Sequence, residues 1–167
     1  MKQTLKYIYS VVYDNLKFAE AKHTIVLTLA GAVLAFATTF FSDNLIQNLF
    51  AIASIIFSLI AIFYSIVALA SRNVRLRANR INIKSNLLYY KDIMKFDENV
   101  YVNTIKKEYD FTNIYKPDSM DFDLAKRIIV VSKLTYIKLL YFNFAIVFLF
   151  SSVLCLSATV LIRGKVW

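Results

Sequence analysis

Four arginines occur within nine residues, in the stretch SRNVRLRANR at positions 71–80. A guanidinium group keeps its charge at physiological pH and binds phosphates or carboxylates through paired hydrogen bonds. On a helix, which turns 100° per residue, the four side chains do not share one face. Arg72 and Arg75 point to one side, where contact with lipid headgroups below a membrane span explains them. Arg77 and Arg80 point elsewhere and need another explanation.

The second pair of arginines begins a cationic stripe that leads to two tyrosines. Lys84 and Lys91 fall on its face, and the stripe runs roughly 20 Å at 1.5 Å per residue. Two interpretations remain open: a solvated face, or a site where cations hold phosphate beside a ring that stacks on a base. A second cationic row on the last predicted helix is placed to face it. The candidate ligand-binding residues are Arg77, Arg80, Lys84, Tyr89, Tyr90, Lys91, Asp92, Arg127 and Lys138.

The residue types that enzymes and metal sites require are scarce. The only glycines are Gly31 and Gly164, so the chain has no glycine-rich phosphate loop. One histidine and one cysteine, His23 and Cys155, are far apart in the sequence and make no metal-binding pattern. We therefore expect no enzymatic activity, no metal and no cofactor, with a regulatory ligand as the small molecule that the chain binds.

Three uncharged runs provide the elements that must position the cationic residues. They cover residues 24–41, 45–70 and 139–162, in a chain that is 59% hydrophobic with a net charge of +9. About 20 apolar residues cross a hydrocarbon core roughly 30 Å thick, so each run is long enough to span. The 23 amphipathic residues before the first run do not fit a cleaved signal peptide. The predicted fold class is an all-α membrane protein with three transmembrane helices.

The distribution of lysine and arginine predicts the orientation of these helices. Residues 71–138 carry fourteen basic residues against eight acidic ones, four lysines precede the first run, and the loop at 42–44 has none. Cytoplasmic loops carry the excess of basic residues. We expect a cytoplasmic N-terminus and an external C-terminus.

The chain divides into three parts: 1–70, with an amphipathic N-terminal helix and two spans; 71–138, a cytoplasmic helical region; and 139–167, with the third span and a short external tail. The first helix is expected to run unbroken from the cytoplasm through the first span, and the second to continue to about Met94. A helix over 98–109 and one that begins after Pro117 complete the prediction. Asp118, Ser119 and Asp121 suit the N-cap and an acidic first turn of the latter. Asp43 or Asn44 suits the N-cap of the second span. The cytoplasmic region is small, so we expect a homo-oligomer.

Small residues recur at spacings of three and four in the first two spans. Such stripes let helices approach closely in lipid, and their hydroxyl groups also suit the lining of a pore between subunits. Packing and pore lining both remain open. The candidate residues are Thr24, Thr28, Gly31, Ala35 and Thr38 in the first span, and Ser54, Ser58, Ala61 and Ser65 in the second.

Three segments, in this order, resemble the transmembrane effector family of Pycsar anti-phage systems. LKFAEAKHTIVLTLAGAVLAF (16–36) is similar to that family's F-A-D-x-K entry into the first span. NLLYYKDIMKFDENVY (86–101) resembles its aromatic-aromatic-G-D-I segment, and DLAKRIIVVSKLTYIKLLYF (123–142) its L-A-x-Q-I…S…K stretch. Lys91 stands where the family has glycine, and Arg127 where it has glutamine.

The resemblance implies an infection-triggered effector in the bacterial inner membrane, controlled by a nucleotide from a neighbouring cyclase or nucleotidyltransferase. The expected partners are the lipid bilayer, further copies of the chain and that nucleotide, but no duplex nucleic acid. The ligand is expected to be a cyclic nucleotide or, given the added cations at Lys91 and Arg127, an oligonucleotide, and it either opens or closes a pore that depolarises the membrane. The alternative is a membrane-anchored scaffold that binds an acidic partner or lipid without a pore.

Overall fold

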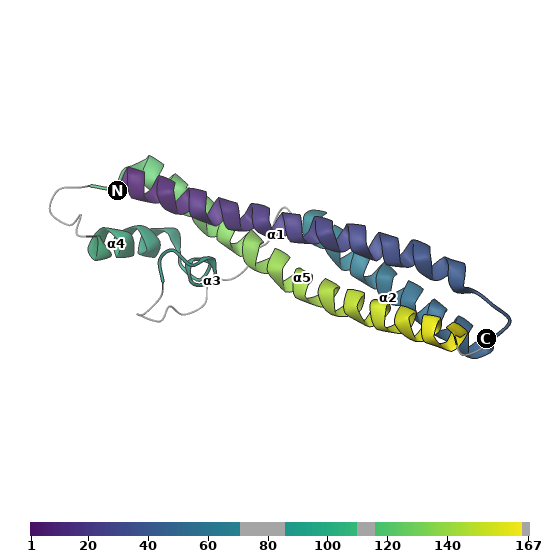
Figure 1. Ribbon diagram of the computed structural model, residues 1–167. Helices are drawn as coiled ribbons and strands as arrows, with labels where there is room; N and C mark the ends of the chain where they lie inside the picture. Colours follow the sequence, from purple (N-terminus) through teal and green to yellow (C-terminus); the bar gives the residue numbers. More distant parts are fainter. Residues whose placement is uncertain (71–85, 110–115, 165–167) are drawn as a thin grey trace. The chain divides into compact units, whose positions relative to one another are not determined.

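The structure is a computed structural model and describes residues 1–70, 86–109 and 116–164 (Figure 1). These residues form helices and no strand. Helices α1, α2 and α5 are long and apolar enough to cross a membrane, which confirms the all-helical prediction with three candidate spans. The elements are α1 (Lys2–Ala37), the 3-10 helix η1 (Thr38–Phe40), α2 (Leu45–Ala70), α3 (Tyr90–Ile93), α4 (Glu98–Glu108) and α5 (Ser119–Gly164).

The chain folds as two compact units, and both α1 and α5 contribute to each of them. The first, here called the charged unit, contains the described residues 1–19, 86–109 and 116–138. The second, the apolar unit, contains 20–70 and 139–164. No glycine or proline interrupts α1 before Gly31, so a single helix of 36 residues forms where the sequence predicts one.

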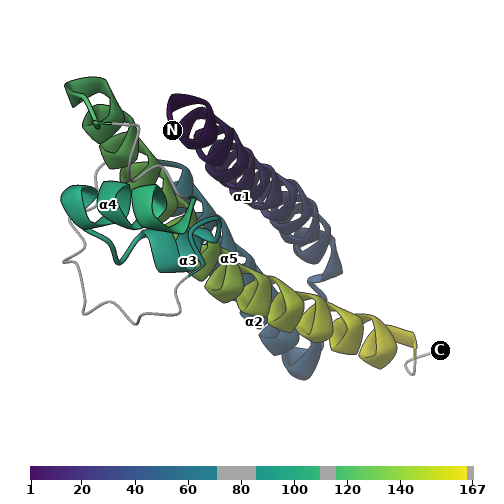
Figure 2. The ribbon, with the colours of Figure 1, turned by 90° about the vertical axis from the view of Figure 1, so that its left-hand side faces the viewer.

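The core of the charged unit joins the first turns of α1 to the short helices and to α5. Leu5, Ile8 and Val12 are fully buried and follow the predicted apolar face of α1. They pack against Ile128 of α5 and Ile105 of α4 in one continuous hydrophobic cluster. Figure 2 shows α3 and α4 beside the first part of α5. Packing of this kind holds the segment from 86 to 109 against the two long helices.

The start of α5 is fixed by a reciprocal pair of carboxylates. Asp118 Oδ1 accepts a hydrogen bond from the Asp121 N–H at 3.0 Å, and Asp121 Oδ2 accepts one from the Asp118 N–H at 3.1 Å. This is the geometry of a capping box, and it satisfies backbone donors that the first turn leaves free. Lys2 Nζ donates to Asp118 Oδ2 at 2.9 Å, which ties the beginning of α1 to the same point. The acidic cap predicted after Pro117 is therefore confirmed.

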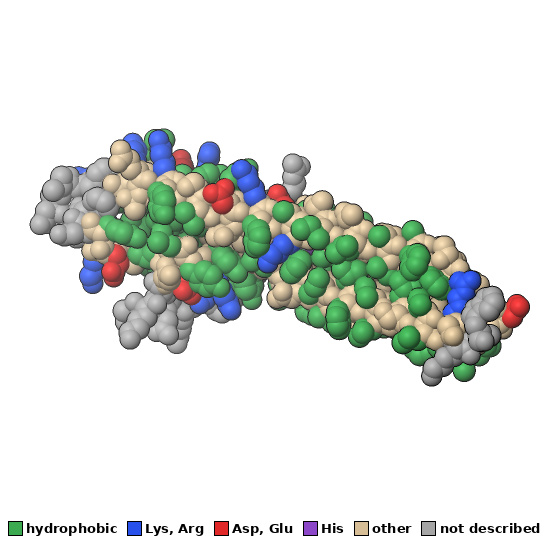
Figure 3. Space-filling view, in the orientation of Figure 1, with side chains coloured by type: hydrophobic (Ala, Val, Ile, Leu, Met, Phe, Trp, Pro, Cys, Tyr) green, Lys and Arg blue, Asp and Glu red, His purple; other side chains and the backbone are tan. Residues whose placement is uncertain are grey.

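In the apolar unit, α2 turns its small residues inward. Its buried residues include six small ones: Ala51, Ser54, Ser58, Ala61, Ser65 and Ala68. Short side chains let the helices approach closely, and in lipid this proximity replaces the hydrophobic effect as a source of stability. The outer faces carry large exposed apolar side chains, among them Leu45, Phe63 and Leu161. Figure 3 shows hydrophobic side chains along this unit, as expected for a surface that meets lipid.

The hairpin between the first two spans closes through side-chain amides. Asn44 Oδ1 accepts hydrogen bonds from the backbone N–H groups of Ile46 and Gln47, at 3.0 and 3.4 Å, so Asn44 caps α2. Asn48 pairs with both backbone groups of Ser42, at 2.9 and 2.7 Å. Of the two predicted caps, Asn44 is the one that forms.

The prediction of a helix that continues from the second span to Met94 is wrong. Helix α2 is described to Ala70, and residues 86–89 form a turn before α3 begins at Tyr90. Asn86 supports this turn, because its Oδ1 accepts a hydrogen bond from the Leu88 N–H at 2.9 Å. Asparagine competes with the helix in this way by bonding to its own backbone.

Candidate functional site

Three of the predicted ligand-binding cations, Arg77, Arg80 and Lys84, lie outside the described residues, as do Arg72 and Arg75. The stripe that they form in the sequence therefore stays a prediction. The remaining candidates are described and belong to the charged unit. They come from two places: the segment around α3, and the face of α5 before the third span.

Tyr89 and Tyr90 lie together, with ring centroids 4.8 Å apart and an interplanar angle of 56°. Tyr89 is 43% exposed, whereas Tyr90 is partly buried and packs against the core of the charged unit. Burial, together with a hydrogen bond to Tyr89, raises the pKa of Tyr90 from 10.0 to about 12, so the Tyr90 phenol is neutral at pH 7. Tyr89 is therefore the more exposed ring and the better candidate for stacking, and Tyr90 supports it from the core.

Asp92 closes the turn that carries the two tyrosines. Its Oδ2 accepts a hydrogen bond from the Asn86 N–H at 3.2 Å, and its Oδ1 accepts one from Lys95 Nζ at 3.0 Å. The bond from Lys95 is the main cause that lowers the pKa of Asp92, followed by the bond from Asn86. Because its oxygens are used within the turn, Asp92 is better suited to positioning its neighbours than to holding a ligand, while Lys91 beside it is exposed.

Tyr101 anchors the same turn to α4 and was absent from the predicted site. Its hydroxyl donates to the Leu87 carbonyl at 2.9 Å, and its ring is fully buried at 5.4 Å from that of Phe96. Burial raises the pKa of Tyr101 above its ordinary value. A buried aromatic residue that hydrogen-bonds across 14 positions depends on tertiary packing, so helical periodicity gave no signal for it.

The predicted pair on α5 has two different environments. Arg127 is exposed on the surface of the charged unit, whereas Lys138 is only 4% exposed. A lysine so close to the apolar run needs polar contacts for its ammonium group. Among the described residues, no hydrogen bond or ion pair joins Arg127 to Tyr89 or Tyr90.

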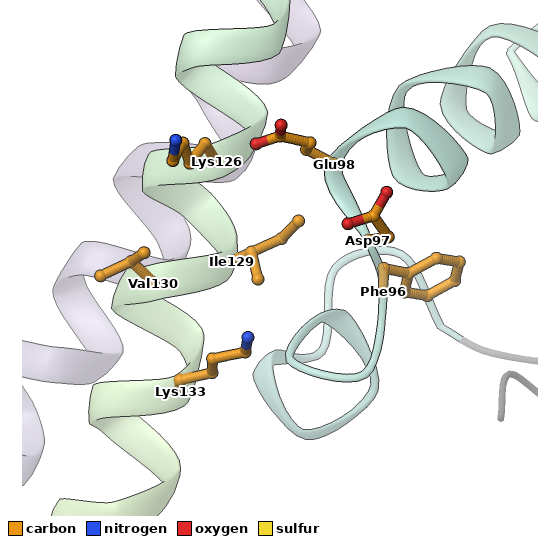
Figure 4. A pocket seen from close by; sticks show the side chains of 7 residues that line it. All are labelled: Phe96, Asp97, Glu98, Lys126, Ile129, Val130 and Lys133. Carbon is orange, nitrogen blue, oxygen red and sulfur yellow. The ribbon is translucent and has the colours of Figure 1, made fainter. Parts of the chain in front are cut away.

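A groove of about 200 Å³ lies between α5 and the residues that lead into α4, entirely within the charged unit (Figure 4). Lys126 and Lys133, two helical turns apart on α5, line one wall. Asp97 and Glu98 line the other. Sequence analysis missed this groove, because the two walls are separated by about thirty positions and neither forms a motif.

The groove has an apolar side between its charged groups. Ile129 and Val130 of α5 and Phe96 complete the lining, and Ile129 and Phe96 are buried. In Figure 4, Ile129 points from α5 into the space between the two walls. Apolar surface flanked by a few charged groups is the usual character of a small-molecule site.

The small-residue candidates of the two spans have opposite positions within the subunit. In the second span Ser54, Ser58, Ala61 and Ser65 are buried inside the apolar unit. In the first span Thr24, Thr28, Ala35 and Thr38 are exposed and Gly31 is half-buried. A Cβ atom added at Gly31 meets nothing within 4 Å. Only the stripe of the first span is therefore available to a second copy of the chain.

The threonines of the exposed stripe satisfy their own hydroxyl groups. Thr24 and Thr28 each donate to the carbonyl four residues earlier, at 3.2 and 3.1 Å, and Thr38 donates to the Ala35 carbonyl at 2.7 Å. Because each hydroxyl group already donates a hydrogen bond to the backbone, exposing these side chains to lipid costs little free energy. The hydroxyl oxygens retain acceptor capacity toward a neighbouring helix or water.

The comparisons with known proteins agree with the resemblance found in the sequence. The family profile described as the Pycsar effector protein domain matches residues 4–164. No curated protein and no solved structure gives a significant match. Because the family match covers nearly the whole chain, and because three helices are suited to membrane spans, the chain belongs to the Pycsar effector family as a membrane effector of anti-phage defence.

Proposed function

We propose that this effector forms an oligomeric pore, or a membrane-disrupting assembly, whose state is set by a nucleotide second messenger. During infection its activity depolarises the bacterial inner membrane and arrests growth. The N-terminus and the charged unit lie in the cytoplasm, where a neighbouring cyclase or nucleotidyltransferase supplies the nucleotide, and the C-terminus lies outside. The protein is not an enzyme in this proposal, and it needs no metal.

One structural observation carries the proposal. Helices α1 and α5 each continue without interruption from the charged unit into the apolar unit. Binding in the charged unit that favours one arrangement of these two helices also favours one arrangement of the spans. A ligand shifts such an equilibrium only by the difference in its affinity for the two states. The proposal therefore requires the nucleotide to bind one state of the assembly more tightly.

The exposed stripe of α1 is the surface that we assign to contact between subunits. Thr28 and Gly31 present little bulk and are not needed for packing within the subunit. Close approach of two such stripes suits helix association in lipid, and threonine hydroxyls at the seam offer oxygen atoms to ions or water. The buried serines of α2 contribute to a pore only if the bundle within one subunit opens.

Purified protein in liposomes with a potassium gradient tests this function. The expected result is a change in ion flux when a cyclic mononucleotide or a short oligonucleotide is added, and the direction of the change gives the sign of control. Membrane-potential dyes in cells that express the protein provide the matching measurement in vivo. If flux and potential stay unchanged with every nucleotide while the protein retains an acidic partner, the scaffold alternative replaces the pore.

The orientation is tested separately with reporter fusions. A reporter after Trp167 is expected to read as external, and one before Met1 as cytoplasmic, because basic residues favour the cytoplasmic side. A cytoplasmic signal from the C-terminal fusion contradicts three spans with this orientation.

A further inference from the structure

The buried face of α2 carries no large apolar side chain. Alanine at such positions is explained by the close packing of helices in lipid. That packing does not require hydroxyl groups, and polar groups inside a membrane commonly belong to paths for protons or ions. The buried residues of α2 are Gln47, Ala51, Ser54, Ser58, Ala61, Ser65 and Ala68.

The serine cluster on this face has fewer hydrogens than its oxygen pairs need. Four oxygen pairs formed by Ser54 and Ser58 of α2 and Ser152 of α5 lie at hydrogen-bond distance, from 2.7 to 3.0 Å. Each hydroxyl group carries one hydrogen and two lone pairs. Three hydrogens therefore serve four oxygen pairs, and at least one pair has no hydrogen of its own. The cluster thus keeps lone pairs that can accept a further hydrogen.

The spacing of these oxygens suits protons better than metal cations. Oxygens that share a hydrogen lie about 2.5–3.0 Å apart, and all four pairs fall in this range. A metal cation would have to enter between oxygens that are already this close and push them apart. A proton needs no such space, because it lies within the hydrogen bond itself.

Ser65 continues the polar face beyond the cluster. It follows Ser58 by seven residues, which is roughly 10 Å along a helix at 1.5 Å per residue. Its side chain is fully buried, and its hydroxyl oxygen has no hydrogen-bond partner among the described residues. A buried hydroxyl group without a partner is costly, and an ordered water molecule is a common way to satisfy it. The Ser65 hydroxyl therefore indicates a position for water inside the apolar unit.

Gln47 connects the same face to the surface of the hairpin. Its Nε2 donates to the Phe40 carbonyl at 2.9 Å, and its Oε1 accepts a hydrogen bond from the Ser42 hydroxyl at 2.9 Å. Gln47 is buried, whereas Ser42 is exposed. Along the buried face of α2, only Ala51 and Ala61 separate the polar positions from one another, so water between them meets no bulky side chain of this helix.

We propose that these polar groups carry protons through each subunit, with water completing the path between them. We call them the hydroxyl face, which consists of Gln47, Ser54, Ser58, Ser65 and Ser152. A hydroxyl group accepts a hydrogen bond while it donates its own hydrogen, so it can take up a proton on one side and release another on the opposite side. Each transfer leaves the hydroxyl group neutral. The helices need not separate, because the proton moves along hydrogen bonds.

The inference rests on the proposed function and deepens it, because it names the proton as the ion whose flux depolarises the membrane. Full-length protein in liposomes that contain a pH-sensitive dye tests it, with and without the nucleotides of the potassium assay. Ser65→Ala should lower proton flux about tenfold, the size of effect expected when one hydrogen bond is lost on the path. Its thermal stability should not fall, since no hydrogen bond within the protein is lost. Unchanged proton flux in this variant overturns the inference.

Ser151→Ala is the matched control. It removes a hydroxyl group of the same residue type from α5, one that donates to the Val147 carbonyl of its own helix at 3.0 Å. Proton flux in this variant should equal that of the wild-type protein. A decrease as large as that of Ser65→Ala shows that any serine of the spans has this effect, and it overturns the assignment of the path.

Two substitutions of Ser58 separate the hydroxyl group from the size of the side chain. Ser58→Ala removes the hydroxyl that lies 2.8 Å from that of Ser152 and should lower proton flux, whereas Ser58→Thr retains a hydroxyl and should restore most of it. Thermal unfolding checks that both variants fold. If both are folded and conduct equally poorly, the hydroxyl group is not what carries the proton, and the inference is overturned. If threonine does not fit at this position, Ser65→Ala decides the question.

The remaining outcomes separate this inference from the proposed function. If Thr28→Ala lowers proton flux more than Ser65→Ala does, the path follows the exposed stripe of α1, and the inference fails while the pore stands. Potassium flux as large as the proton flux, with neither changed by Ser65→Ala or Ser58→Ala, has the same meaning. If the fluxes of both ions equal those of empty liposomes under every condition, the inference and the proposed function both fail.

Discussion

The hydroxyl groups of Ser54 and Ser152 lie 2.9 Å apart, and each also bonds to the other residue's backbone carbonyl, at 3.0 Å from Ser54 and 2.7 Å from Ser152. Ser58 adds a third hydroxyl, 2.8 Å from that of Ser152. Three buried hydroxyl groups therefore join α2 to α5 in the middle of two apolar spans. Without water to compete, such bonds connect helices more specifically than apolar packing does.

Replacing Ser152 with alanine is expected to lower the stability of the apolar unit by about 1–2 kcal/mol, because hydrogen bonds between helices in membranes contribute roughly 0.6–1.7 kcal/mol each. Thermal or denaturant unfolding in detergent measures the change. Ser151→Ala is the matched control, since the Ser151 hydroxyl donates a hydrogen bond to the Val147 carbonyl of its own helix. Equal effects of the two substitutions would show that the serine cluster adds nothing to the contact between helices.

Gly31 and Ala61 allow packing within a subunit to be distinguished from packing between subunits. Ala61 is fully buried, so Ala61→Leu overpacks the bundle and is expected to cost about 1–3 kcal/mol of stability. Gly31→Leu meets open space and should leave the subunit as stable as before. Its expected effect is on subunit number, measured by light scattering or native mass spectrometry in detergent. An unchanged subunit number in Gly31→Leu argues that α1 makes no contact at that position.

Asp118 predicts an acid-dependent loosening of the charged unit. The hydrogen bond from Lys2, followed by that from the Asp121 N–H, lowers the pKa of Asp118 below its ordinary value of 3.8. A carboxyl group whose pKa is lowered on folding stabilises the folded state above its unfolded pKa, and this contribution is lost as the pH falls through the folded pKa. We therefore expect stability to decline below about pH 4.

Asp118→Asn isolates this contribution, because asparagine retains the N-cap but not the charge. Compared with the wild-type protein, the variant should be slightly less stable at pH 7 and should lose less stability between pH 5 and pH 3. Unfolding midpoints across that range measure the difference. Parallel curves for the two proteins would mean that the Lys2–Asp118 pair has no role in the acid response.

The cationic stripe is tested by comparing two arginines. If Arg80 holds a phosphate, Arg80→Ala should weaken nucleotide binding. The slope of the logarithm of the binding constant against the logarithm of the salt concentration should also become shallower by slightly less than one. Arg72→Ala should instead affect membrane insertion and leave affinity almost unchanged. The two tyrosines should differ in the same assay. Tyr89→Ala should cost about 1–3 kcal/mol of binding if its ring stacks on a base, whereas Tyr90→Ala should mainly lower stability. If the two arginine variants bind nucleotide equally well, the cationic stripe is not part of the binding site.

The sequence alone predicted the features that depend on neighbours along the chain. The buried face through Leu5, Ile8 and Val12 follows helical periodicity, and the caps at Asn44 and Asp118 follow from the hydrogen-bonding capacity of their short side chains. These features need no knowledge of tertiary structure.

Features that depend on distant segments were missed or mistaken. Asp97 and Lys126 line one groove only because α4 packs against α5, and no local pattern relates them. Asn86 offered a signal for the turn at 86–89, but the prediction of a continuous helix relied on the absence of glycine and proline between the second span and Met94. The sequence identified Lys138 as a cation but did not reveal that its side chain is buried. A lysine near a span has the same sequence context whether its side chain faces solvent or the core.

The salt bridge from Lys2 to Asp118 joins residues that are 116 positions apart, which sets the order in which a nascent chain can fold. The first two spans leave the ribosome while Leu5, Ile8 and Val12 still lack the α5 residues that cover them. The charged unit therefore reaches its native packing only after translation has passed residue 129. We expect chains truncated before α5 to expose this apolar face and to be degraded, so that a cell producing the effector accumulates only full-length copies.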